Sequence, residues 1–301
     1  MSISKKNLFS IERISTEDGL TLEGIVAKSK NRRKKMAVLF VHGLGGSYGN
    51  AVRNKELARA CVKNGMAYAI FNNRGHDVVS SFRKKFSGKN ISSKHIYGGM
   101  AFEKFEECIF DIRAMLKFLE KIGYPKVVLL GHSTGANKVL YYFYKTKDKR
   151  VRGLCLAGPL SDIVIEKQSL GRKFYQTLKK VKKFAKRNPD SLLPPSITSR
   201  IMTARRYLSL HTPGGAEDTF PYAYKGRGFR ELKTIRIPVS VILGEKDSYL
   251  DRPAKDLIKV FKKNTLRAKT FHGVSIKGGD HSYYGREREF ANAVTDWAKN
   301  I

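Results

Sequence analysis

The sequence is poor in cysteine and lacks long apolar runs, and each shortage excludes a class of protein. Only three of the 301 residues are cysteines, Cys61, Cys108 and Cys155. Each stands alone in an apolar segment, which favours buried reduced thiols over a disulfide framework or a zinc cluster. No apolar run approaches the roughly 20 residues that a transmembrane helix needs, and the first residues lack the apolar core of a secretory signal. We therefore expect a reduced, cytoplasmic protein.

Acidic residues are also scarce. Lys and Arg total 59 and Asp and Glu total 26, so the formal net charge is +33 at pH 7. A disordered polybasic tail is excluded, because 41% of the residues are hydrophobic and 11% are aromatic, enough to build a large core in a chain of this length. The basic residues are spread along the whole chain and do not form one stripe. Contact with nucleic acid or an anionic membrane is therefore an alternative that we do not favour.

The sequence does contain a regular alternation of strand-like and helix-like segments. A hairpin is predicted from residues 9–14 and 21–27 around Asp18-Gly19, followed by an unbroken apolar strand over residues 36–41. Later strands are predicted over residues 66–71, 126–130, 152–157, 237–243 and 270–276, and helices over residues 54–64, 101–122, 136–145, 253–262 and 287–298. Because crossovers between parallel strands are right-handed, this order predicts an α/β fold with a mostly parallel central sheet and helices on both faces.

The alternation stops between about residues 161 and 230. A basic amphipathic stretch at 169–187 is followed by three breaks, at Asn188-Pro189, Pro194-Pro195 and Pro213-Gly214-Gly215. Because strands resume afterwards, we interpret residues 161–230 as an inserted helical cap, and residues 1–160 and 231–301 as the core of one domain. The basic stretch is interpreted as a cap helix whose apolar face covers a substrate pocket, with contact to an anionic membrane or nucleic acid as the alternative.

The strongest motif is Gly131-His132-Ser133-Thr134-Gly135, which lies between a predicted strand and a predicted helix. This is the context of a nucleophile elbow, G-x-S-x-G. The glycines leave room for a sharp turn that presents the Ser133 hydroxyl at the carboxyl edge of the sheet. The Thr134 backbone N–H, at the start of the helix, can stabilise an oxyanion. Ser133 is therefore the candidate nucleophile.

A serine nucleophile needs a base and an acid that orients the base. Two predicted strands end at Gly244-Glu245-Lys246-Asp247 and at Gly278-Gly279-Asp280-His281, so Asp247 and His281 should lie at the same sheet edge as Ser133. The resulting order is Ser, Asp, His. Asp162, which follows the strand ending at residue 157, is the alternative acid.

The glycine-rich loop His42-Gly43-Leu44-Gly45-Gly46 follows the first parallel strand, where a second oxyanion donor is expected. The Leu44 backbone N–H is the candidate donor, and His42 is interpreted as a residue that braces this loop. Arg74 and His76, which follow the next strand, are interpreted in the same way, with binding of a substrate carboxylate or phosphate as the alternative. No cluster has the spacing of metal ligands, so we expect no metal and no other cofactor.

Together these motifs resemble the alpha/beta-hydrolase superfamily over nearly the whole chain. The residues involved are His42-Gly43-Leu44-Gly45-Gly46, Asn73-Arg74-Gly75-His76, Gly131-His132-Ser133-Thr134-Gly135, Gly244-Glu245-Lys246-Asp247 and Asp280-His281-Ser282. The chain is similar to carboxylesterases, cinnamoyl esterases, monoglyceride lipases and serine aminopeptidases, and its elbow resembles a branch that includes siderophore-ester hydrolases.

The resemblance implies an alpha/beta-hydrolase fold and a carboxylesterase-like serine hydrolase. Such an enzyme cleaves a small-molecule ester or acyl substrate through an acyl-enzyme intermediate. Two other functions stay open: a peptidase or amidase with the same triad, and a non-catalytic basic module that binds RNA or acidic lipid.

Overall fold

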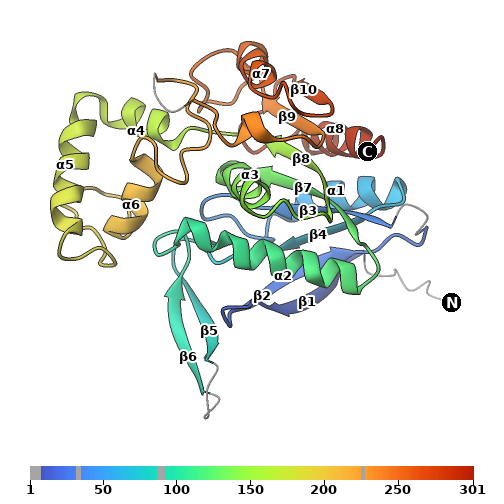
Figure 1. The fold of residues 1–301 in the computed structure, drawn as a ribbon, viewed down its shortest axis with the longest axis horizontal. Helices are drawn as coiled ribbons and strands as arrows, with labels where there is room; N and C mark the ends of the chain where they lie inside the picture. The colour runs from blue at the N-terminus through green and yellow to red at the C-terminus, as the bar shows by residue number, and fades with distance from the viewer. Residues whose placement is uncertain (1–7, 32–34, 87–91, 225–227) are drawn as a thin grey trace.

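The computed structural model describes residues 8–31, 35–86, 92–224 and 228–301. Its centre is an eight-stranded sheet in the order β1-β2-β4-β3-β7-β8-β9-β10 (Figure 1). β2 pairs antiparallel with both β1 and β4, and all other neighbours in this sheet run parallel. The strands are β1 Ser10–Ser15, β2 Thr21–Ala27, β3 Met36–Val41, β4 Ala67–Phe71, β7 Lys126–His132, β8 Val151–Ala157, β9 Val239–Gly244 and β10 Phe271–Ile276. The predicted mostly parallel sheet, with its hairpin at one edge, is confirmed.

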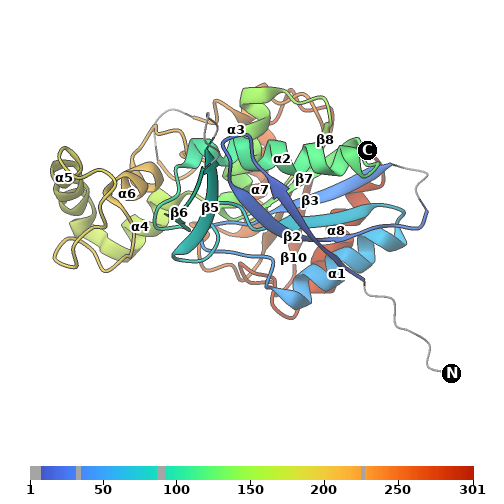
Figure 2. The same ribbon diagram turned by 90° about the horizontal axis from the view of Figure 1, so that it is seen from below.

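Helices cover both faces of the sheet. Alternate residues of β3 supply opposite cores: Leu39 packs with the helices of one face, and Val38 and Phe40 pack with those of the other. This double burial explains why the strand is apolar at every position. Figure 2 shows α1 and α2 on opposite sides of the sheet. One face carries α1 Ala51–Lys63 and α8 Glu287–Ala298, and the other carries α2 Cys108–Lys121, α3 Thr134–Thr146 and α7 Ala254–Lys263.

Two features before α2 differ from the prediction. The expected helix over residues 101–122 begins as a 3-10 turn at Phe105–Glu107 and becomes α2 only at Cys108. The preceding residues instead form turns that place Glu103 among buried basic side chains. In addition, β5 Ser80–Phe86 and β6 Ser92–Gly98 form a separate antiparallel pair that the sequence analysis did not predict.

Three helices occupy the region interpreted as a cap, and they lie together to one side of the sheet (Figure 1). They are α4 Asp162–Leu170, α5 Phe174–Ala185 and α6 Ala204–His211. The basic helix expected over residues 169–187 is present over a shorter range as α5, because Gly171, with φ +53°, separates it from α4. Phe174, Leu178 and Val181 of α5 pack on residues of α4 and α6 in a small apolar core of their own.

A chain of buried charges joins this helical region to the sheet. Lys138 of α3 contacts Glu103 at 2.5 Å, and Arg206 of α6 contacts Glu103 at 3.1 Å and Glu217 at 2.5 Å. All four side chains are buried. Because an isolated buried charge is expensive, each of these groups depends on the others.

The three cysteines are buried free thiols, as predicted. Burial raises the pKa of the Cys155 thiol to about 12, which keeps it protonated and unreactive. None of the helices within the described ranges is both long enough and apolar enough to span a membrane.

Candidate active site

Ser133 lies on a turn with a strained backbone, which is the feature that the predicted nucleophile elbow requires. Ser133 has φ 57° and ψ −131°, a conformation that side-chain-bearing residues rarely adopt. The neighbouring glycines make the turn possible. A Cβ on Gly135 would lie 2.1 Å from the Val41 carbonyl oxygen, and one on Gly131 would lie 2.3 Å from the Gly135 carbonyl oxygen. The glycine spacing of the motif thus reflects close backbone approach between β3, β7 and α3.

His281 and Asp247 are hydrogen-bonded. The distance from His281 Nδ1 to Asp247 Oδ2 is 2.8 Å, and Asp247 Oδ1 accepts a hydrogen bond from the Tyr249 backbone N–H at 2.9 Å. A carboxylate only accepts, so the His281 proton lies on Nδ1 and Nε2 is left as the basic atom. Within the described ranges, no hydrogen bond or ion pair joins Asp162 to His281. Of the two candidate acids, Asp247 is therefore the one that contacts the histidine.

Ser133 and His281 line one cavity of about 260 Å³, together with Leu44 and Thr134. The described contacts include no hydrogen bond between the Ser133 hydroxyl and His281. Hydrogen bonds of this kind are often long before a substrate is bound. The cavity thus brings together every residue that the sequence analysis selected as nucleophile, base or oxyanion donor.

The loop that contains Leu44 approaches the elbow closely. A Cβ on Gly43 would lie 2.8 Å from Ser133 Cβ and 3.1 Å from the Thr134 nitrogen, so only glycine fits at this position. His42 braces the loop, as predicted, because its Nδ1 lies 2.9 Å from the Gly43 carbonyl and its Nε2 accepts from the Asn73 N–H at 3.0 Å. Burial lowers the pKa of His42 to about 3, so the ring is neutral.

Arg74 also has the bracing role predicted for it. Its guanidinium contacts Asp111 at 2.8 Å and Asp18 at 3.1 Å, and its side chain is 5% exposed. These contacts hold the loop after β4 against α2 and the opening hairpin. Arg74 is therefore committed to structure and is not available to a ligand.

His132 is a residue whose role the sequence analysis missed. Its Nε2 donates a hydrogen bond to the His281 carbonyl oxygen at 2.7 Å, and the two rings lie 4.9 Å apart. Burial lowers the pKa of His132 well below its usual value, so the ring is neutral and its other nitrogen carries no proton. His132 positions the loop that bears His281. In the sequence, only the position of His132 next to Ser133 in the motif indicated that it could have a role at the site.

The cap region supplies the opposite wall of the cavity. The expectation that the basic helix would cover the pocket is wrong, since no residue of α5 lines it. The wall comes instead from the strand-to-helix connection after β8, from α4, from the segment before α6 and from α6 itself. The residues are Leu160, Asp162, Ile165, Arg200, Met202, Leu210 and His211, with Tyr249 from the loop after β9.

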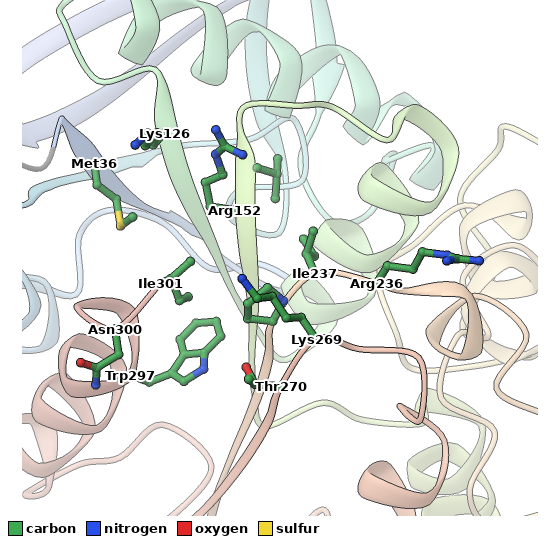
Figure 3. Close-up of a pocket in the computed structure, with 12 residues that line it drawn as sticks. Met36, Lys126, Arg152, Arg236, Ile237, Lys269, Thr270, Trp297, Asn300 and Ile301 are labelled. Carbon is green, nitrogen blue, oxygen red and sulfur yellow. The ribbon is translucent and has the colours of Figure 1, made fainter.

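A second hollow, of about 540 Å³, lies at the amino ends of the parallel strands and holds none of these residues (Figure 3). Basic side chains surround it, namely Lys126, Arg152, Arg236 and Lys269. Across the described ranges, no group of three or more His, Cys, Asp or Glu side chains is placed to hold a metal ion.

Comparison with known proteins places the chain in one family and one fold. The profile of the family described as "Protein of unknown function (DUF1749)" matches residues 20–297. No curated protein sequence matches the chain significantly.

Solved structures match over nearly the full length. Est1E from Butyrivibrio proteoclasticus is 17% identical, with TM-score 0.64 and coverage of 95% of this chain and 97% of its own. The siderophore hydrolase EstB from Aspergillus fumigatus is 20% identical, with TM-score 0.63 and coverage of 99% of both chains. The Pyrococcus furiosus esterase PF2001 is 15% identical, with TM-score 0.59 and coverage of 99% of this chain and 94% of its own. These likenesses confirm the alpha/beta-hydrolase fold predicted from the sequence.

Proposed function

The chain belongs to the DUF1749 family, and we propose that it is a serine hydrolase that cleaves carboxylic esters of small molecules. The observation behind this proposal is one cavity that holds a serine on a strained turn and a histidine bonded to a buried carboxylate. The structural likeness to a protein named as an esterase and to one named as a siderophore hydrolase supports an ester over an amide as the substrate.

In the proposed first step, the Ser133 oxygen attacks the ester carbonyl carbon while His281 Nε2 takes the hydroxyl proton. Asp247 stabilises the resulting imidazolium through its 2.8 Å contact with Nδ1. The negative charge that develops on the carbonyl oxygen is stabilised by the backbone N–H groups of Leu44 and Thr134. The tetrahedral intermediate then collapses, and the alcohol leaves with the proton from His281.

In the second step, His281 removes a proton from water, and the hydroxide attacks the acyl group on Ser133. Collapse of this intermediate releases the carboxylic acid and returns the proton to the Ser133 oxygen. In this proposal the strained Ser133 conformation keeps the Ser133 oxygen at the cavity wall, both as the hydroxyl and as the ester oxygen of the acyl-enzyme. No metal or cofactor enters the proposed reaction.

The test is labelling with a fluorophosphonate, together with turnover of 4-nitrophenyl butyrate. We expect the wild-type protein to be labelled at Ser133 and to hydrolyse the ester, and Ser133→Ala to lose both properties while keeping its unfolding midpoint. Ser47→Ala, which changes a serine of the neighbouring glycine-rich loop, is the matched control and should retain both. Absence of labelling, with salt-sensitive retention on RNA, would favour the binding-module alternative.

A further inference from the structure

Asp162 is an unpaired carboxyl in the wall of the candidate active site. It is the first residue of α4 and lines the same cavity as Ser133 and His281. No hydrogen bond or ion pair from its side chain to another described residue is present in the structure. Most carboxyls in this basic chain have a cationic partner, so Asp162 is unusual, and it does not orient the histidine.

The charges around Asp162 are already balanced by other groups. Arg200, which also lines the cavity, bonds to Glu166 of α4 at 2.8 Å. Arg206 of α6 is bonded to Glu217 and Glu103. His211 of α6 is neutral, because burial lowers its pKa to about 4. None of these neighbouring groups therefore forms a direct ion pair with Asp162.

The environment of Asp162 makes its ionisation sensitive to a ligand. Burial raises its pKa to about 7, and the negative charge of Glu217 adds to this effect, while Arg206 and Arg200 oppose it. A cation bound beside the carboxyl would favour the ionised form. The position of Asp162 at the start of α4 also favours a negative charge. This position does not explain why the side chain lines the cavity.

We propose that Asp162 is a substrate-binding residue that pairs with an ammonium group of the ester, so the preferred substrates are amino-functional esters. This inference rests on the proposed hydrolase function and names its substrate class. The remaining wall is largely apolar, with Leu160, Ile165, Met202 and Leu210. A short aliphatic chain ending in an ammonium group therefore matches both the volume of about 260 Å³ and the chemistry of the cavity.

The experiment compares pairs of esters that differ only in an ammonium or a methyl group at one end. In the first pair, 4-nitrophenyl 6-aminohexanoate and 4-nitrophenyl heptanoate, the group is on the acyl side. In the second, 5-aminopentyl butyrate and hexyl butyrate, it is on the alcohol side. We expect kcat/KM to favour the ammonium ester by about 10- to 100-fold in one pair, the range of a charge-assisted hydrogen bond.

Three variants identify the source of that preference. Asp162→Asn should lower the ammonium-to-methyl ratio at least tenfold, and Asp162→Glu should restore most of it. Asp190→Asn removes the same charge from an exposed site in the cap region, where Asp190 pairs with Arg205, and should leave the ratio unchanged. Because each comparison is a ratio, an effect of the substitution on both esters cancels.

The pH dependence supplies a readout that a purely structural role would not produce. The wild-type ratio should rise between pH 6 and pH 8, as Asp162 ionises, and should be flat in Asp162→Asn. A pH effect on the steps common to both esters cancels in the ratio. If Asp162→Asn does not fold, the wild-type pH profile still tests the proposal.

Ratios near one for both pairs, with Ser133-dependent hydrolysis intact, would overturn the ammonium proposal and leave the hydrolase proposal standing. A preference for the methyl ester in both pairs would also overturn it. If no ester is hydrolysed, the proposed function fails, and binding of the alcohol-side pair to Ser133→Ala is measured by calorimetry. Binding of the ammonium ester that is at least tenfold tighter would support the role of Asp162, and equal binding would reject it.

Discussion

The pairing of Asp247 with His281 makes a specific prediction for Asp247→Asn. In the wild type, Oδ1 accepts from the Tyr249 N–H at 2.9 Å and Oδ2 accepts from His281 at 2.8 Å. An asparagine must keep its oxygen toward Tyr249, because that backbone group can only donate. Its NH₂ group then faces His281 Nδ1, which must become the acceptor. The His281 proton is therefore forced onto Nε2, where it blocks proton removal from Ser133.

A base held in the wrong tautomer lowers kcat about 10⁴-fold, which corresponds to about 5 kcal/mol of transition-state stabilisation. We expect this loss for 4-nitrophenyl butyrate, with KM changed much less, because the substitution does not alter the cavity wall. The fold should survive, since asparagine has nearly the same shape, and urea unfolding checks this.

The matched control is Asp251→Asn on the same loop. Asp251 pairs with Arg252 at 2.7 Å, away from the histidine, and this variant should keep kcat within a few-fold of the wild type. An Asp247→Asn enzyme that retains more than about a tenth of wild-type kcat would refute the assignment of Asp247 as the orienting acid.

Two further predictions concern stability. Arg206→Met should lower the free energy of unfolding by about 3–5 kcal/mol, because Glu103 and Glu217 lose their shared partner. The control Arg205→Met removes an exposed ion pair and should lower it by at most about 1 kcal/mol. If the two variants unfold at the same urea concentration, the buried network does not stabilise the fold as described. His42 has a pKa lowered from 6.5 to about 3, so the unfolded chain binds its proton first and stability falls as pH drops below 6.5. Between pH 7 and pH 5 the free energy of unfolding of the wild type should therefore fall by about 2 kcal/mol more than that of His42→Gln, whose side chain cannot take up a proton. If urea unfolding shows the same pH dependence for both proteins, His42 is not buried in its neutral form.

The parts of the fold that could be predicted are those with a local signature. The strand over residues 36–41 is apolar at every position because both faces are buried, and its predicted bounds agree with β3. The sharp turn around Ser133 could be predicted because the backbone crowding between β3, β7 and α3 leaves a glycine pattern in the sequence. Both signals come from a few consecutive residues.

The parts that were missed depend on contacts between distant segments. β5 contains Arg83, Lys84 and Lys85, and Phe82 is its one buried apolar side chain, so its own sequence gives little sign of the pairing with β6. The basic stretch reads as one amphipathic helix, and the break at Gly171 is visible only from its positive φ. Likewise, nothing near Asp162 in the sequence shows that it lacks a cationic partner.

The buried charges that join α3 to α6 limit how the cap region can move. Swinging α6 away from the core would separate Arg206 from Glu103 and would leave a buried carboxylate with one cationic partner fewer. Buried ion pairs thus link α3, which follows Ser133, to α6, which contributes Leu210 and His211 to the cavity wall. We therefore expect a substrate of the proposed reaction to reach Ser133 without a large swing of α6.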